Sequence, residues 1–191
     1  MEKNVDDVGF IDTMLAQLLK DYPIDPKRVY ITGLSNGGMM SHRLGTELSD
    51  KITAIAPVIS GLFGDEKQPA QPVAALMING MLDESVPYLG GAPGGGFSQR
   101  WRGTPIKPAS YQADFWAKAN DCEAKVTEQD LGFAMHWKHN CPNQKTVELY
   151  LVKDNGHAWP GGQPGTRRAD TPSQAMNATD VIWTFFRNHT K

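Results

Sequence analysis

The 191-residue sequence lacks long hydrophobic runs and carries little net charge. No apolar stretch approaches the ~20 residues that a membrane-spanning helix needs, so no membrane span is predicted. A net charge of −2 gives no electrostatic reason to expect a nucleic acid or an anionic membrane as a partner. The first residues, which include Glu2, Lys3 and an acidic pair, do not resemble a secretory signal peptide, so this stretch is not expected to be one.

Cysteine is scarce, because Cys122 and Cys141 are the only two in the sequence. Cys141 closely follows His136 and His139, so a metal site must be considered. On an extended segment these two histidines point to opposite faces, and no second closely spaced pair of ligands exists. We therefore predict no metal and no cofactor. A disulfide between the cysteines would stabilise the fold by ~3 kcal/mol in the chain-entropy model and would imply an extracellular compartment, whereas two buried thiols are the alternative.

What the sequence does contain is a regular alternation of strand-like and helix-like segments. Forty per cent of the residues are apolar and 21% are charged, as in a globular protein, and the length fits one domain over residues 1–191. The alternation predicts an α/β fold with a largely parallel sheet. Helices are expected from a cap at Asn4 to Pro23 and at 39–48, 108–120 and 172–188, and strands at 28–32, 52–59, 73–78 and 146–152, with a hairpin at 125–137.

The strands carry more detailed predictions. Those at 52–59 and 73–78 are apolar throughout, as interior parallel strands should be. Pro57 cannot donate a ladder hydrogen bond, so the last residues of its strand are expected to leave the sheet. The strand at 146–152 alternates between apolar and polar residues, which predicts a position near a sheet edge.

A Gly-x-Ser-x-Gly turn connects the first strand to the second helix. This strand–turn–helix context is what a nucleophile elbow requires, because glycines relieve crowding and let Ser35 adopt a strained, exposed conformation. Gly33 and Gly37 are expected to be the crowded positions. The helix that follows aims free N–H groups at the same place, which favours a developing oxyanion. The alternative is an ordinary turn that happens to contain serine.

Two further polar residues follow later strands in the order that α/β-hydrolases use, which is serine, then acid, then histidine. Asp83 follows the third strand and His157 the fourth, so both can reach Ser35 at one edge of the sheet. Asp83 could instead be only an Asx-turn residue, and His157 only a loop histidine. Asp65 and Asp154 are rival acids, but a loop after the neighbouring strand reaches the far side of an imidazole more readily.

Three motifs stand out: Gly-Leu-Ser-Asn-Gly-Gly-Met-Met at 33–40, Asn-Gly-x-x-Asp-x-x-Val-Pro at 79–87 and Gly-His-Ala-Trp-Pro-Gly-Gly at 156–162. They resemble secreted polyhydroxybutyrate depolymerase-like and feruloyl-esterase-like carboxylesterases, and the resemblance covers nearly the whole chain. It implies the α/β-hydrolase fold, a secreted protein, and ester hydrolysis with Ser35 as nucleophile, Asp83 as acid and His157 as base. Cysteines in this region of the family are commonly paired, which supports a disulfide between Cys122 and Cys141.

The sequence departs from that family at its start. Family members carry a further stretch with early strands and a His-Gly-type loop that gives a second oxyanion N–H, and this chain is expected to lack both. Only the backbone N–H of Asn36 is then assignable to the oxyanion hole, and losing one donor can cost on the order of 100-fold in rate. The strand before Ser35 is expected to be an exposed edge. A truncated polypeptide, a complementing N-terminal segment or a homo-oligomer would each account for this.

The sequence therefore predicts two-step acyl transfer on a small or polymeric ester of unspecified kind. Trp159, beside His157, is a candidate for lining the substrate pocket, with ordinary packing as the alternative. His42 lies two turns from Ser35 and is expected to be packed or on the surface instead of catalytic. The glycine-rich stretch 88–107 lacks the ending of a phosphate loop and is expected to be a surface segment near the site. A serine peptidase of the same fold and a non-catalytic binding module derived from a hydrolase are the rival functions.

Overall fold

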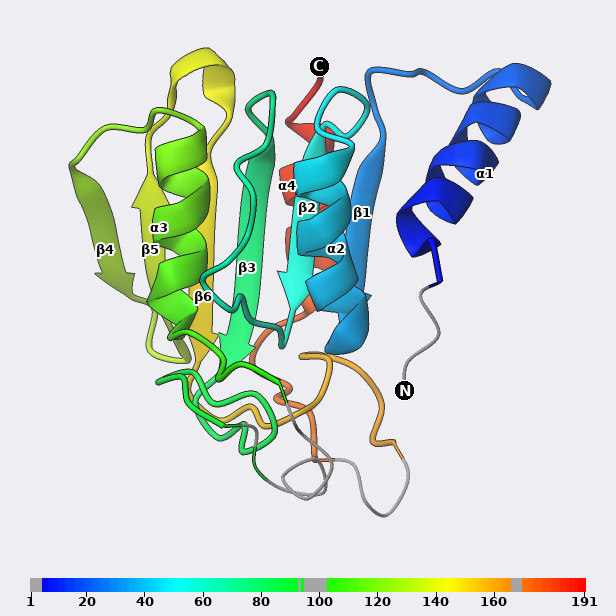
Figure 1. Ribbon diagram of the computed structural model, residues 1–191. Helices are drawn as coiled ribbons and strands as arrows, with labels where there is room; N and C mark the ends of the chain where they lie inside the picture. The colour runs from blue at the N-terminus through cyan, green and yellow to red at the C-terminus, as the bar shows by residue number, and fades with distance from the viewer. Residues whose placement is uncertain (1–4, 93, 95–102, 166–169) are drawn as a thin grey trace.

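The computed structural model describes residues 5–92, 94, 103–165 and 170–191, and its centre is one six-stranded sheet (Figure 1). The strands lie in the order β1-β2-β3-β6-β5-β4. The first four in that order are parallel, and the hairpin of β4 and β5 adds two antiparallel strands beside β6. The bounds are β1 Tyr30–Leu34, β2 Ala54–Val58, β3 Ala74–Gly80, β4 Val126–Asp130, β5 Ala134–His139 and β6 Val147–Val152.

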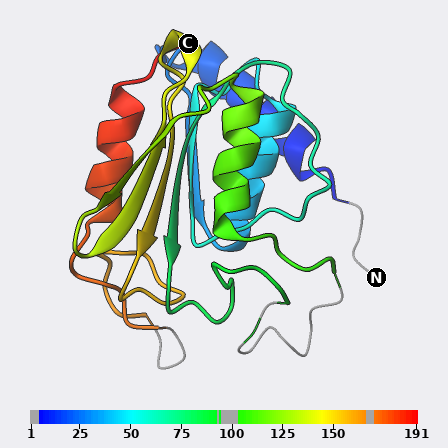
Figure 2. The same cartoon turned by 90° about the vertical axis from the view of Figure 1, so that its left-hand side faces the viewer.

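Helices cover both faces of the sheet. α2 and α3 lie on one face, α4 lies on the other, and α1 stands beside β1 (Figures 1 and 2). The predicted α/β fold, with a mostly parallel sheet flanked by helices, is therefore confirmed. The bounds are α1 Asp7–Asp21, α2 Asn36–Glu47, α3 Ala109–Ala119 and α4 Ala178–Arg187, and a short 3₁₀ turn, η2, spans Pro142–Gln144.

The central strands are buried on both sides because helices pack against both faces of the sheet. Every residue of β2 and β3 is buried. The cluster on the α4 side includes Ile78 and Phe186, and the cluster on the side of α2 and α3 includes Ile55 and Trp116. These strands form a well-packed platform, and their carboxyl ends lie at the lower edge of the sheet in Figure 1.

Cys122 and Cys141 form a disulfide, as predicted. Cys122 follows α3 and Cys141 follows β5, so the bond closes a loop that contains the whole β4–β5 hairpin. The two histidines of this region lie on opposite faces of β5, as the spacing predicted. The His136 ring contacts the Glu148 carboxylate, whereas His139 lines a cavity beside α3.

Some element boundaries differ from the sequence-based expectation. α1 is capped by Asp6, whose Oδ1 accepts a hydrogen bond from Gly9 N at 2.8 Å, and the expected cap, Asn4, lies outside the described residues. β1 begins two residues later than expected and continues to Leu34. α4 begins later than residue 172, because Asn177 supplies the cap through a hydrogen bond from the first turn of the helix.

β6 is an interior strand between β3 and β5, so its predicted position near a sheet edge is wrong. Its alternation arises because the two faces of the strand are covered unequally. Val147 and Leu149 belong to the cluster under α3. Glu148 and Tyr150 are half-buried on the opposite face, where a cavity of about 680 Å³ lies between them and α4.

Pro57 remains within β2, level with Gly33 of β1, so the expectation that the end of this strand leaves the sheet is also wrong. The absent N–H is accommodated because the pairing with β3 skips positions 56 and 57 and resumes at Val58. The Val58 carbonyl then accepts a hydrogen bond from Ser35 N at 3.0 Å. β2 therefore supports the candidate nucleophile directly.

β1 is an edge strand with β2 as its one strand neighbour in the described part of the chain, as predicted. The adjacent helix α1 exposes Phe10, Met14 and Leu18, which are four residues apart and so share one face. α1 is also the longest helix, at 15 residues, and no helix among the described residues is both long and apolar enough to cross a bilayer.

Candidate active site

Ser35 occupies the sharp turn between β1 and α2, as the elbow motif predicted. Its φ of 56° and ψ of −117° lie in a region that non-glycine residues seldom adopt, at a cost of about 1–3 kcal/mol. A Cβ at Gly33 would lie 2.5 Å from the Gly37 carbonyl, so this glycine is required. The predicted crowding at Gly37 is wrong, because a Cβ there would meet no described atom within 4 Å. The second crowded position is Gly38, whose Cβ would lie 2.6 Å from that of Ser60.

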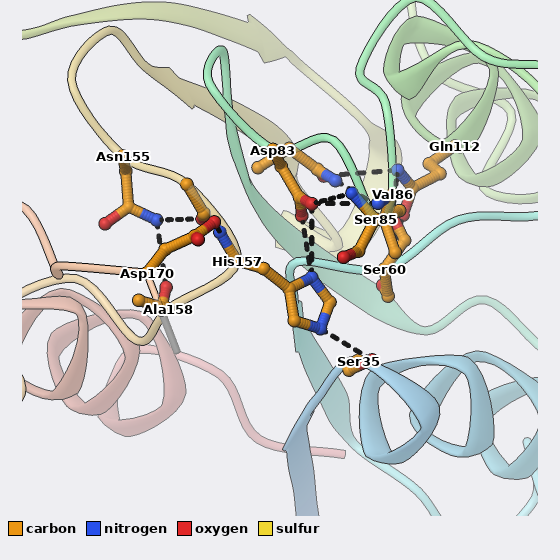
Figure 3. A network of polar contacts seen from close by, with 12 residues as sticks. Ser35, Ser60, Asp83, Ser85, Val86, Gln112, Asn155, His157, Ala158 and Asp170 are labelled. Atoms are coloured by element: carbon orange, nitrogen blue, oxygen red, sulfur yellow. Dashed lines mark hydrogen bonds and ion pairs between the residues drawn. The ribbon is translucent and has the colours of Figure 1, made fainter. Parts of the chain in front are cut away.

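The structure brings Ser35, His157 and Asp83 together from the ends of three parallel strands (Figure 3). His157 Nε2 lies 3.0 Å from Ser35 Oγ, and His157 Nδ1 lies 3.0 Å from Asp83 Oδ2 and 3.2 Å from Oδ1. Since a carboxylate only accepts, Nδ1 carries the proton and Nε2 presents its lone pair to the serine hydroxyl. This is the arrangement that lets an imidazole take a proton from a serine.

Asp83 combines both interpretations that the sequence left open. Its Oδ1 accepts hydrogen bonds from Ser85 N at 2.7 Å and Val86 N at 2.8 Å, which is the geometry of an Asx turn. The same carboxylate contacts His157, and its side chain is fully buried. The turn therefore holds the acid in the direction that the imidazole needs.

Neither rival acid occupies that position. Asp65 lines a cavity of about 650 Å³ between α2 and the segment after β2, and Asp154 is exposed at the end of β6. The structure adds a carboxylate that the sequence did not suggest, because Asp170 Oδ2 accepts a hydrogen bond from His157 N. Asp170 lies 13 residues away along the chain, and its neighbours carry no motif, so no sequence signal indicated it.

His42 is packed within the fold, as expected, and its hydrogen bonds go to residues other than Ser35, His157 and Asp83. Trp116 Nε1 donates to His42 Nδ1 at 3.0 Å, and His42 Nε2 lies 2.7 Å from Gln112 Oε1. Burial lowers the pKa of His42 to about 4, and the hydrogen bond to Gln112 opposes that shift. Gln112 continues the network to the Asn79 side chain and the Ser60 carbonyl, directly behind the elbow.

Asn36 and Trp159 are the other predicted site residues, and each is adjacent or nearly adjacent in the sequence to a residue of the candidate site. Asn36 is the first residue of α2, so its N–H has no acceptor within the helix and lies at the positive end of the helix dipole. The Trp159 side chain packs against the cluster under α4, and its Nε1 donates to Thr179 Oγ1 at 3.1 Å. Part of the glycine-rich stretch, 93 and 95–102, falls outside the described residues.

Across the described ranges, no group of three or more His, Cys, Asp or Glu side chains is arranged to hold a metal ion.

Comparison with known proteins relates the chain to esterases. No family model matches. Feruloyl esterase B of Piromyces equi is 32% identical over 169 residues, which cover 85% of this chain and 31% of the relative. The probable feruloyl esterase C of Aspergillus niger is 26% identical over 187 residues, which cover 96% of the chain and 58% of the relative. The chain thus spans less than two thirds of the length of either relative.

Solved structures support the same fold. An acetyl xylan esterase from Aspergillus awamori superposes with a TM-score of 0.55 at 13% identity, covering 94% of this chain and 66% of that one. A thermostable esterase superposes with a TM-score of 0.57 at 15% identity, covering 98% and 38%. The likeness to polyhydroxybutyrate depolymerases stays a prediction. The chain is similar in sequence to feruloyl esterases and has the α/β-hydrolase fold.

Proposed function

We propose that this chain is the catalytic part of a secreted serine carboxylesterase that uses Ser35, His157 and Asp83. One observation carries the proposal. Ser35 stands in a strained conformation at the start of a helix, with the imidazole 3.0 Å from its hydroxyl oxygen and a buried carboxylate behind that imidazole. Because the sequence relatives are named esterases, ester hydrolysis is the reaction that we assign to this arrangement.

The reaction is double acyl transfer. Ser35 Oγ attacks the ester carbonyl carbon while its proton passes to His157 Nε2, and Asp83 stabilises the imidazolium. The tetrahedral intermediate then expels the alcohol, which takes the proton from Nε2, and an acyl group remains on Ser35. Water attacks this acyl-enzyme, gives its proton to Nε2, and the acid departs as Ser35 regains its hydrogen. No cofactor is needed.

The oxyanion of each intermediate is expected to bind the backbone N–H of Asn36, at the positive end of α2. We expect a second donor to come from a complementing segment or another copy of the chain, because an oxyanion hole usually has two. Both sources would be able to approach along the open edge of β1. Supplying that donor should raise kcat with little change in KM, since the bond forms mainly in the transition state.

The names of the sequence relatives, which include feruloyl esterases and an acetylxylan esterase, support a substrate class. We propose an ester of a feruloyl, acetyl or other short acyl group, with polyhydroxyalkanoate-type esters as a further option. Trp159 is the candidate for contact with the substrate, since it lies two residues from His157 and is partly exposed. A Trp159→Ala variant that loses aryl-ester turnover more than acetyl-ester turnover would support this role.

The proposal is tested by hydrolysis of p-nitrophenyl acetate. Wild type and Ser110→Ala, which removes an exposed hydroxyl on α3, should turn over alike, whereas Ser35→Ala should be inactive. A fluorophosphonate probe should label the first two proteins and leave Ser35→Ala unlabelled. Turnover that survives in Ser35→Ala would overturn the assignment of the nucleophile. Labelling at Ser35 without turnover would indicate an activated serine that lacks the rest of its oxyanion hole.

A further inference from the structure

The acid and the base of the candidate site stand on different loops, and one residue contacts both loops. Asp83 lies on the loop after β3, and His157 lies on the loop after β6. We infer that Asn155 is the positioning residue that fixes the imidazole of His157 against Asp83 and Ser35. This inference rests on the proposed function, because it concerns the geometry of the same reaction.

The Asn155 side chain holds the peptide groups around His157. It is fully buried, and its Nδ2 donates to the carbonyl of Gly156 at 2.8 Å and to that of Ala158 at 2.9 Å. The carbonyl groups of the residues on either side of His157 therefore accept hydrogen bonds from the same side-chain amide, that of Asn155 (Figure 3). Such a clamp restrains the backbone from which the imidazole projects.

The remaining oxygen of Asn155 joins this loop to the segment before α4. Its Oδ1 accepts a hydrogen bond from Ser173 N at 2.8 Å. Asp170, on the same segment, accepts from His157 N, and a Cβ at Gly156 would lie 2.3 Å from that carboxylate. The segment that contains Asp170 and Ser173 therefore contacts both the backbone of His157 and the side chain that clamps it.

The main chain of Asn155 reaches the other loop. Its carbonyl accepts a hydrogen bond from Leu82 N at 3.0 Å, and Leu82 immediately precedes Asp83. The approach is so close that a Cβ at Gly80 would lie 2.1 Å from the Asn155 carbonyl oxygen. One residue thus contacts the Asp83 loop through its backbone and the His157 loop through its side chain.

The Asn155→Asp variant removes this clamp with almost no change of shape. It keeps an acceptor for Ser173 N but places an oxygen against the carbonyls of Gly156 and Ala158, which lose their shared donor and repel it. The loop must then move, and a displacement of ~1 Å at the imidazole can lower the rate about 100-fold. We expect kcat to fall by about that factor while KM changes less than about threefold.

The chain offers a matched control in Asn120. This asparagine is also buried, its Nδ2 donates to the carbonyls of Val73 and Lys145 at 2.8 and 3.0 Å, and its Oδ1 accepts from Val73 N at 3.0 Å. It clamps the amino ends of β3 and β6, about 20 Å from the candidate site by the rise of a strand. Asn120→Asp therefore makes the same chemical change at a buried asparagine far from the candidate site. It controls for any loss of activity that comes only from lower stability.

The experiment compares wild type, Asn155→Asp, Asn155→Ala and Asn120→Asp. Thermal unfolding identifies a temperature at which all four are folded, and p-nitrophenyl acetate kinetics are measured there. A fall of about 100-fold in kcat for both Asn155 variants, with kcat of Asn120→Asp within about threefold of wild type, supports the inference. Equal kcat losses at the two sites, or a kcat of Asn155→Ala close to wild type, would overturn it.

A readout that needs no turnover separates this inference from the proposed function. The proton between His157 Nδ1 and Asp83 gives a far-downfield proton NMR resonance when the pair is held in place. Positioning by Asn155 predicts that this resonance is lost or shifted in both Asn155 variants and retained in Asn120→Asp. Wild-type protein that neither hydrolyses the ester nor reacts with the fluorophosphonate probe would contradict the proposed function, and the resonance would still decide the role of Asn155. An unchanged resonance in the Asn155 variants would overturn that role.

Discussion

Gly37 and Gly38 are neighbours in the first turn of α2, and an alanine is expected to have opposite effects at the two positions. A Cβ at Gly38 would lie 2.6 Å from Ser60 Cβ, 2.9 Å from Ser60 Oγ and 3.0 Å from the Gly33 carbonyl oxygen. A Cβ at Gly37 would meet no described atom within 4 Å. The glycine of the Gly-x-Ser-x-Gly motif should therefore accept a side chain, and the glycine after it should not.

The magnitudes follow from these distances. Carbon atoms pack at ~3.5–4.0 Å, so Gly38→Ala forces either α2 or the segment at Ser60 to move. Overpacking of this kind costs about 1–3 kcal/mol, and the movement reaches Ser35 at the start of the same helix, where it should lower kcat about 100-fold. Gly37→Ala replaces a helical glycine without a clash, so the free energy of unfolding should stay the same or rise by about 0.5–1 kcal/mol.

Urea unfolding and p-nitrophenyl acetate hydrolysis of the two variants measure both effects. Both variants exchange glycine for alanine in the same turn, so the change in backbone entropy of the unfolded chain is the same in each. The difference between them therefore reports the clash alone. If Gly37→Ala lost as much stability or activity as Gly38→Ala, the placement of crowding in this elbow would be refuted.

Three further predictions concern the site and its support. Asp83→Asn should lower kcat on the order of 10³- to 10⁴-fold by favouring the wrong imidazole tautomer. The kcat of Asp154→Asn should equal that of wild type. Full turnover by Asp83→Asn would exclude Asp83 as the acid. Below pH 6.5 the His42 imidazole binds a proton in the unfolded state, but in the folded state it stays neutral until the pH approaches its pKa of about 4. The contribution of His42 to the free energy of unfolding should therefore be complete above pH 6.5 and fall by about 3 kcal/mol as the pH drops toward 4. Urea titrations of wild type and His42→Gln would detect this loss in wild type and a smaller one in the variant. Replacing Cys122 and Cys141 by serine should lower the free energy of unfolding by ~3 kcal/mol and the Tm with it, as calorimetry would show.

The convergence of Ser35, His157 and Asp83 could be predicted from the sequence because its determinants are local. A Gly-x-Ser-x-Gly turn between an apolar strand and a helix specifies the conformation of Ser35 within a few residues. Asp83 and His157 each follow a buried strand, and parallel strands bring their carboxyl ends to one edge of the sheet. Neither inference required any knowledge of which side chains meet across the fold.

Features that depend on long-range packing could not be predicted in the same way. The crowding at Gly38 comes from Ser60, on a different strand end, and the polar face of β6 is half-buried because of the cavity beside α4. Asp170 contacts His157 from 13 residues farther along the chain, and no motif in the sequence marks it. Asn155 stands only two residues before His157, so its neighbourhood was visible, but the three partners of its side chain were not.

Asp83 shows that an Asx-turn role and the proposed catalytic role are compatible in one residue. From the sequence, an Asx turn and a triad acid were competing interpretations, because each explains an aspartate in a loop after a strand. In the structure Oδ1 accepts the two turn N–H groups, and Oδ2 makes the shorter contact with His157 Nδ1. The turn supplies two hydrogen bonds that satisfy the buried carboxylate and fix its direction. A buried acid with no such turn would lose the two hydrogen bonds that orient it, so a common loop motif can support the proposed role of Asp83 as the acid of the site.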